Sequence, residues 1–119
     1  MPLLFALLLS ISNPSLIQIP RVEAQVLTTD DLKTIASADA AHYGLNTEHF
    51  LAVINKESGR NPTATSTTEY YGIAQWHISD HNMTIEQADD PIYALDKMAQ
   101  AWSEGHEKWW VAWKQLYGK

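Results

Sequence analysis

Residues 52–75 read AVINKESGRNPTATSTTEYYGIAQ, an apolar segment, a break, a Thr-rich segment and a strand-like run. The apolar segment ends on one carboxylate, Glu57, and after Ser58 the Gly, Asn and Pro of residues 59–62 follow. An Asn-Pro pair cannot continue a helix, and the Thr and Ser of residues 63–70 favour turns or a small β-hairpin. The stretch therefore predicts an acid at the end of a helix, beside a short β element.

The apolar segment places Glu57 on the buried side of its helix. Phe50, Val53 and Ile54 precede it by seven, four and three positions, which puts these side chains on one face. A carboxyl group against apolar walls has a raised pKa, because burial penalises its charged form. A general acid at neutral pH needs this property. A glutamate that simply reaches solvent would also fit the position, so the spacing alone leaves the role of Glu57 open.

Capping signals predict five helices in all. The central one is expected from Asn46 or Thr47 to Gly59, and five consecutive apolar residues within it indicate that it is buried. The others are expected from Thr28 or Thr29 to Gly44, for one or two turns after Thr84, from Asp90-Pro91 to Gly105, and from about His106 to Tyr117. The fold class is therefore mainly α (α+β), a helical bundle around a buried central helix with a short β-hairpin.

The N-terminal residues 1–24 are expected to be a signal peptide or an N-terminal anchor. Residues 2–20 carry no charged side chain, and Val-Glu-Ala at 22–24 fits a small-residue cleavage site. A buried N-terminal helix is the alternative, but Pro14, Pro20 and the lack of amphipathic spacing argue against it. Residues 25–119 then form one domain, exported to the periplasm, the cell envelope or the outside.

The composition limits the classes of partner. No cysteine is present, so an exported domain must be stable without disulfides, and five Trp and five Tyr supply buried area instead. The formal net charge of −6 argues against nucleic acid, since phosphate binding calls for a basic face. A monomer is expected.

Two motifs then suggest a family. Glu57-Ser58-Gly59-Arg60-Asn61-Pro62, followed by Tyr71-Gly72-Ile73-Ala74-Gln75, resembles the soluble lytic transglycosylase family of the lysozyme-like superfamily. The family patterns are E-S-x-x-N-P and roughly Y-G-x-x-Q, in this order. The segments of this chain that follow Gln75 also resemble small exported members of the family. The resemblance covers about residues 30–114. It implies a lysozyme-like fold and cleavage of the β-1,4 bond between MurNAc and GlcNAc in peptidoglycan strands, without a metal or organic cofactor.

The resemblance also implies roles for single residues. Glu57 would be the only acid/base, and Ser58 would lie near the peptide or N-acetyl group of the substrate. The other residues expected at the substrate are Tyr71 and Gly72, whose backbone approaches the sugar, Gln75, which hydrogen-bonds in the groove, Trp76, the better candidate for stacking on a sugar, and His77.

The sequence departs from the family pattern in two motifs. The third lacks its usual Asn in residues 90–94, and the fourth, Ala-Tyr-Asn-Ala-Gly, is absent. Its counterpart at 101–105 lacks the tyrosine that commonly touches the catalytic glutamate. Glu69 is a candidate second carboxylate, because an Asp precedes the Tyr-Gly of this strand in hen-type lysozymes. Here Tyr70 holds that position and adjacent strand residues face opposite ways, which favours a solvent-facing Glu69.

Other arrangements of residues carry weaker alternatives. His77 and His81 have the i, i+4 spacing of two metal ligands, but no third ligand is evident, so no metal is expected. Trp109, Trp110 and Trp113 are expected in the core rather than at a sugar. Lytic transglycosylase is the first function, because one carboxylate is well placed, and hydrolytic lysozyme is the second. A non-catalytic glycan-binding module, favoured by the missing fourth motif, and a metal-dependent protein using the two histidines are further alternatives.

Overall fold

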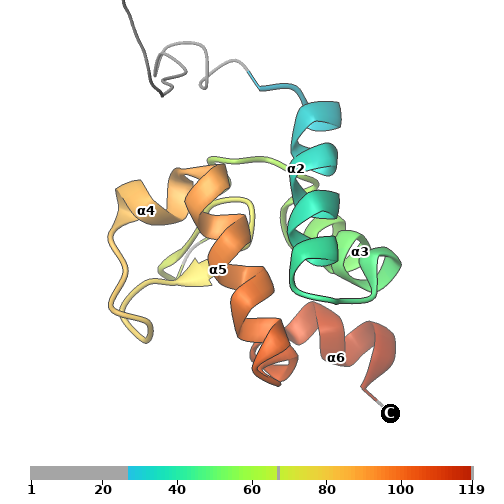
Figure 1. Ribbon diagram of the computed structural model, residues 1–119. Helices are drawn as coiled ribbons and strands as arrows, with labels where there is room; N and C mark the ends of the chain where they lie inside the picture. Colours follow the sequence, from blue (N-terminus) through green and yellow to red (C-terminus); the bar gives the residue numbers. More distant parts are fainter. Residues whose placement is uncertain (1–26, 67, 119) are drawn as a thin grey trace, which may run out of the picture.

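The computed structural model describes residues 27–66 and 68–118, so the expected signal peptide or anchor at residues 1–24 lies outside the described residues. None of the helices in these two ranges is long and apolar enough to cross a membrane. The elements, shown in Figure 1, are α2 (Thr29–His42), α3 (Thr47–Ser58), β2 (Tyr70–Tyr71), β3 (Trp76–His77), α4 (Ile85–Asp89), α5 (Pro91–Ser103), the 3₁₀ turn η2 (Glu107–Trp109) and α6 (Val111–Tyr117). The mainly helical fold class with one small sheet is confirmed.

The first two helices begin at predicted caps, and α3 ends at the predicted Gly59, whereas α2 ends at His42 with Tyr43 as its C-cap, one residue before the predicted Gly44. Thr28 caps α2 in a capping box, in which its hydroxyl accepts from the Asp31 N–H and its own N–H donates to the Asp31 carboxylate. The Asn46 side chain accepts from the His49 N–H at the start of α3. Gly59 ends α3 with φ +63°, a left-handed conformation that glycine adopts without strain. The chain therefore leaves the helix just two residues after Glu57.

The core lies between α2, α3 and α5. Helix α2 packs against both other helices (Figure 1), and α3 buries Phe50, Val53 and Ile54 completely. The α5 helix contributes Leu95 and Met98, also fully buried. The buried stripe of α3 continues toward its C-terminal end, and this directs Glu57 along the packed side of the helix.

The β-hairpin closes at Gly72. β2 pairs antiparallel with β3, with Tyr70 opposite His77 and Tyr71 opposite Trp76. Gly72 has φ +85°, and a Cβ built on it would lie 1.8 Å from the carbonyl oxygen of Ala88 in α4. Only a glycine lets the hairpin approach α4 this closely.

The prediction of one continuous helix at the C-terminal end is wrong. Instead of one helix from His106 to Tyr117, η2 and α6 are separated by Trp110, whose backbone is extended (φ −96°, ψ 119°). The indole N–H of Trp110 donates to the Ala74 carbonyl oxygen at 2.8 Å, and the side chain is buried. Burial of the indole and this hydrogen bond outweigh local helix propensity, so the chain turns at Trp110 to place the ring in the core.

Candidate active site

Glu57 lines a pocket of about 380 Å³ between the end of α3, the hairpin and the junction of η2 with α6. The hairpin region contributes polar and aromatic groups, and the junction contributes mainly apolar ones. The other lining residues are Ser66, Thr68, Tyr70, Gln75, Trp76, His81, Trp109, Trp110 and Val111. Glu57 is therefore the one carboxylate among the described residues that line this pocket.

The half-buried Glu57 has a backbone partner from a distant segment. Its Oε2 accepts a hydrogen bond from the N–H of Ala112, at 3.4 Å. Ala112 is the second residue of α6, where N–H groups have no partner within the helix, and no side chain caps this helix from Trp110. The carboxylate of Glu57 thus takes a place that a capping residue would otherwise fill. This contact restrains the Glu57 carboxylate in a chain whose residues 101–105 contain no tyrosine.

Burial raises the pKa of Glu57 above its ordinary value of 4.5, and the Ala112 N–H and nearby Lys56 offset part of this rise. The prediction of a raised pKa from the apolar spacing on α3 is confirmed. The raised pKa extends the pH range in which Glu57 keeps its proton, as a general acid requires.

The Ala112 contact can be tested with two prolines. Ala112→Pro removes the N–H that donates a hydrogen bond to Glu57. We expect about a tenfold loss of kcat, because the carboxyl group of Glu57 is then less well oriented. The pKa on the alkaline side of the pH–rate profile should also rise, because the N–H lowers the pKa of Glu57. Val111→Pro is the control: it precedes Ala112, follows an extended Trp110 that suits proline, and leaves the bond intact. If both variants are equally slow and show the same pH profile, the Ala112 N–H does not orient Glu57.

Several residues of the two motifs bond within the protein. The Ser58 hydroxyl donates to the Ile73 carbonyl oxygen at 2.7 Å, and Ser58 is not among the lining residues. The Gln75 amide nitrogen donates to the carbonyl oxygens of Ala64 and Gly72 at 3.1 and 3.0 Å. Gln75 does line the pocket, whereas Gly72 is buried against α4. These hydrogen bonds hold the hairpin against the end of α3 and so shape the pocket around Glu57.

The two sides of the hairpin face different pockets. Tyr70 lines the pocket of Glu57, whereas Tyr71 and Glu69 line a separate pocket of about 430 Å³. This is the alternation expected of adjacent strand residues. The structure therefore does not bring Glu69 or Tyr71 together with Glu57, and the side chain of Glu69 is exposed.

The two histidines of the 77–81 segment lie differently. His77, in β3, has its Nδ1 2.9 Å from an Asp80 carboxylate oxygen and does not line the pocket of Glu57. His81, in the turn that follows, does line it, and burial lowers its pKa, which favours the neutral imidazole. No helix spans these residues, so the i, i+4 metal geometry is not formed. Within residues 27–66 and 68–118, no cluster of three His, Asp or Glu could hold a metal ion.

Trp109 and Trp76 differ from expectation in their exposure. Trp76 is only 4% exposed and its indole N–H donates to the Ala94 carbonyl oxygen, so little of its ring is available to a sugar. Trp109, expected in the core, is 50% exposed. Its ring stacks on His106 with an interplanar angle of 2° and lies 4.7 Å from the His81 ring. The expectation for Trp109 is wrong because Trp110 fills the core in its place.

A half-buried acid ending the central helix of a small bundle, with a hairpin as one wall of its pocket, defines a lysozyme-like protein. The family model of the transglycosylase SLT domain matches residues 34–110, which is more than half of the chain. The chain therefore belongs to this family. The match runs from α2 to Trp110 and includes both motifs. Neither the curated proteins nor the solved structures gave a match. Membership supports a lytic-transglycosylase-like role in cleaving peptidoglycan.

Proposed function

We propose that this chain is a lytic transglycosylase that cleaves the β-1,4 bond between MurNAc and GlcNAc, with Glu57 as its only acid/base. The observation that carries the proposal is the presence of one carboxylate in the pocket, half-buried, with a raised pKa. A hydrolase with two carboxylates needs a second group facing the first across the sugar, and Glu69 lines a different pocket.

One carboxyl group can complete this reaction. Protonated Glu57 gives its proton to the glycosidic oxygen as the bond from C1 of MurNAc to that oxygen breaks. The N-acetyl carbonyl oxygen of the same MurNAc stabilises the cation at C1, which replaces a second carboxylate. The Glu57 carboxylate then takes the proton of the C6 hydroxyl group of the same MurNAc, and the oxygen of that hydroxyl group bonds to C1. The product is a 1,6-anhydro sugar, no water is consumed, and Glu57 ends protonated again.

The groups proposed to contact the glycan are those that line the pocket. Gln75, Tyr70 and neutral His81 supply polar groups, and the exposed face of Trp109 suits stacking on a pyranose ring. Trp76 contributes part of the wall. Ser58 and Gly72 are proposed to act indirectly, because their contacts fix the hairpin rather than reach the pocket.

The proposed place of action is the cell wall. Family membership implies peptidoglycan as the substrate, and this polymer lies outside the cytoplasmic membrane. We therefore propose that residues 1–24 act as an export signal or anchor and that residues 25–119 form the catalytic domain, working as a monomer.

The deciding experiment is digestion of purified peptidoglycan followed by mass analysis of the fragments. Anhydro ends, lighter by one water than reducing ends, are expected. Reducing ends would instead identify a hydrolytic lysozyme. Absence of products, together with retained binding to sedimented cell walls, would identify a glycan-binding module, the function that the missing fourth motif favours.

Glu69→Gln separates the one-acid and two-acid mechanisms. Glu69 lies outside the pocket of Glu57, so we expect kcat/KM on peptidoglycan to change by less than about threefold. The loss on Glu57→Gln should be far larger. Comparable losses in the two variants would show that both carboxylates act on the sugar, and the one-acid mechanism would then be abandoned.

A further inference from the structure

A second pocket continues from the pocket of Glu57 across the ring of Trp109. It has a volume of about 320 Å³, and we call it the side pocket. Trp76, His81 and Trp109 line both pockets, so the two share a wall. The remaining residues of the side pocket are Met83, Tyr93, Lys97, Gln100, Ala101 and Glu104. A substrate bound over Trp109 would have access to both.

The polar side of the side pocket is one stripe of α5. Tyr93, Lys97 and Gln100 of α5 and its C-cap residue Glu104 follow one another at intervals of four, three and four residues, which places them along one face of the helix. Another face of α5 carries Leu95 and Met98 into the core. The stripe is thus one part of α5 that is left to meet solvent or a ligand.

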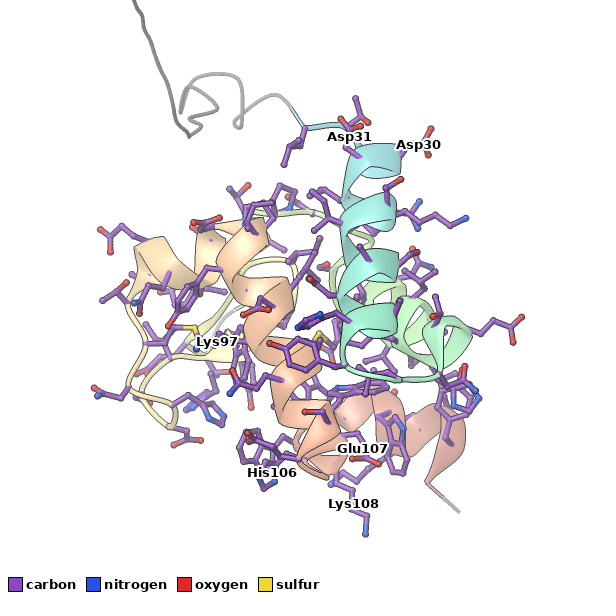
Figure 2. The ribbon with its side chains drawn as sticks, in the orientation of Figure 1. Asp30, Asp31, Lys97, His106, Glu107 and Lys108 are labelled. Atoms are coloured by element: carbon purple, nitrogen blue, oxygen red, sulfur yellow. The ribbon has the colours of Figure 1, made fainter. Side chains whose placement is uncertain are left out.

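Among the described residues that line the side pocket, Lys97 is the only Lys or Arg. Its Nζ lies 3.5 Å from the Gln100 side-chain oxygen and 5.5 Å from the centre of the Tyr93 ring. In Figure 2 it lies on the side of α5 that faces the hairpin region. Among the described residues, no carboxylate lies within ion-pair distance of this ammonium group. In a chain of net charge −6, a half-buried lysine with neutral neighbours offers a site for an anionic group.

The opposite charge lies at the far end of the same stripe. Glu104 is exposed and follows Lys97 by seven residues, which corresponds to about 10 Å along the helix. The side pocket therefore presents a cation and an anion to one ligand, and Met83, Trp76 and Trp109 line it as well.

We propose that the side pocket binds the peptide stem of the glycan being cleaved, with Lys97 pairing with a stem carboxylate. The proposal rests on the proposed function. The sugars of the strand are neutral apart from the lactyl group of MurNAc, to which the stem is joined by an amide bond. Free charges of the intact polymer therefore belong to the stem, which carries carboxylates and, on its diamino acid, an ammonium group. Such a ligand matches both Lys97 and Glu104, whereas a continuing run of sugars would leave Lys97 without a partner.

The test compares two substrates, peptidoglycan with its stems and glycan strands from which an amidase has removed them. Lys97→Met should raise KM about three- to tenfold on the stem-bearing polymer and leave kcat nearly unchanged. On stem-free strands the change should be less than about twofold, and Lys97→Arg should restore much of the loss. Lys33→Met is the matched control, because Lys33 is exposed on α2 and lines neither pocket. Equal losses on the two substrates, or no loss on either, would overturn the proposal.

A binding measurement keeps this proposal separate from the proposed function. The isolated stem tetrapeptide should produce saturable NMR shifts at the Met83 methyl and the Trp109 indole of the Glu57→Gln protein, and Lys97→Met should weaken them. If the protein proves inactive on peptidoglycan but still binds the peptide in this way, the side pocket stands and the catalytic proposal falls. No shifts at these two residues at millimolar peptide would overturn the side pocket even if the enzyme cleaves the wall.

Discussion

Replacing Glu57 with Gln is expected to reduce cleavage of peptidoglycan by at least about 10²–10⁴-fold, the usual contribution of a general acid. The amide of Gln cannot give a proton to the glycosidic oxygen, and no other carboxyl group lines the pocket in the described part of the chain. The Gln oxygen can still accept from the Ala112 N–H, so the fold should be kept. Release of soluble fragments, followed by mass analysis, measures the loss. Activity within tenfold of the unchanged protein would remove Glu57 from the mechanism.

The same substitution should alter stability in a pH-dependent manner. Burial raises the pKa of Glu57 in the folded state above its ordinary value of 4.5, so the folded state holds this proton more tightly than the unfolded chain. The stability that comes from this proton is fully present below pH 4.5 and is lost as the pH rises through the folded-state pKa. Gln carries no charge to bury. Glu57→Gln should therefore melt at a higher temperature than the unchanged protein at neutral pH, with the difference vanishing in acid.

Gly72→Ala is expected to destabilise the fold by about 2–5 kcal/mol, enough to unfold much of a small domain. Two costs combine here. The backbone has φ +85°, which an alanine adopts only with strain, and the added Cβ would meet the Ala88 carbonyl oxygen at 1.8 Å. Either the hairpin or α4 must then move. Urea unfolding followed by tryptophan fluorescence measures the change.

Gly44→Ala is the matched control for Gly72→Ala. Gly44 has φ +70°, but no heavy atom lies within 4 Å of a Cβ built on it. Its substitution should cost only the left-handed strain, about 1–2 kcal/mol. If the two substitutions cost the same, the close approach of the hairpin to α4 does not contribute to stability, and the packing described for Gly72 is incorrect.

Local signals predicted most of the fold because most helix ends are local. Thr28, Asn46, Gly59, Thr84 and Asp90 each cap a helix with neighbouring atoms, and each does so in the structure. The apolar spacing before Glu57 likewise foretold its burial. The break at Trp110 was not predictable in this way, because helix propensity favours continuity and the competing hydrogen bond goes to Ala74, distant in the sequence.

The sequence pointed to Glu57 as the candidate acid, but it did not identify all of the groups that surround Glu57 in the pocket. The motifs singled out Glu57, and the apolar residues of its own helix predict that it lies on the buried side. Its hydrogen-bond partner is the backbone N–H of Ala112. Nearly every residue type has such a group, so the sequence does not reveal it. Exposure of Trp109 depends on which of two adjacent tryptophans enters the core, and spacing cannot distinguish them. Glu69 and Tyr70 differ by one position, and the register of the strand decides which of them faces the acid.

The two contacts that residues 110–112 make with the centre of the site set an order of assembly during synthesis. Trp110 donates to Ala74, and Ala112 holds the carboxylate of Glu57. A ribosome completes both motifs, which end at Gln75, dozens of residues before it reaches this segment. A nascent chain at that stage has its acid but neither the wall nor the amide that holds it in place. We therefore expect the pocket around Glu57 to be complete only after residues 107–117 have folded back onto the hairpin and the end of α3.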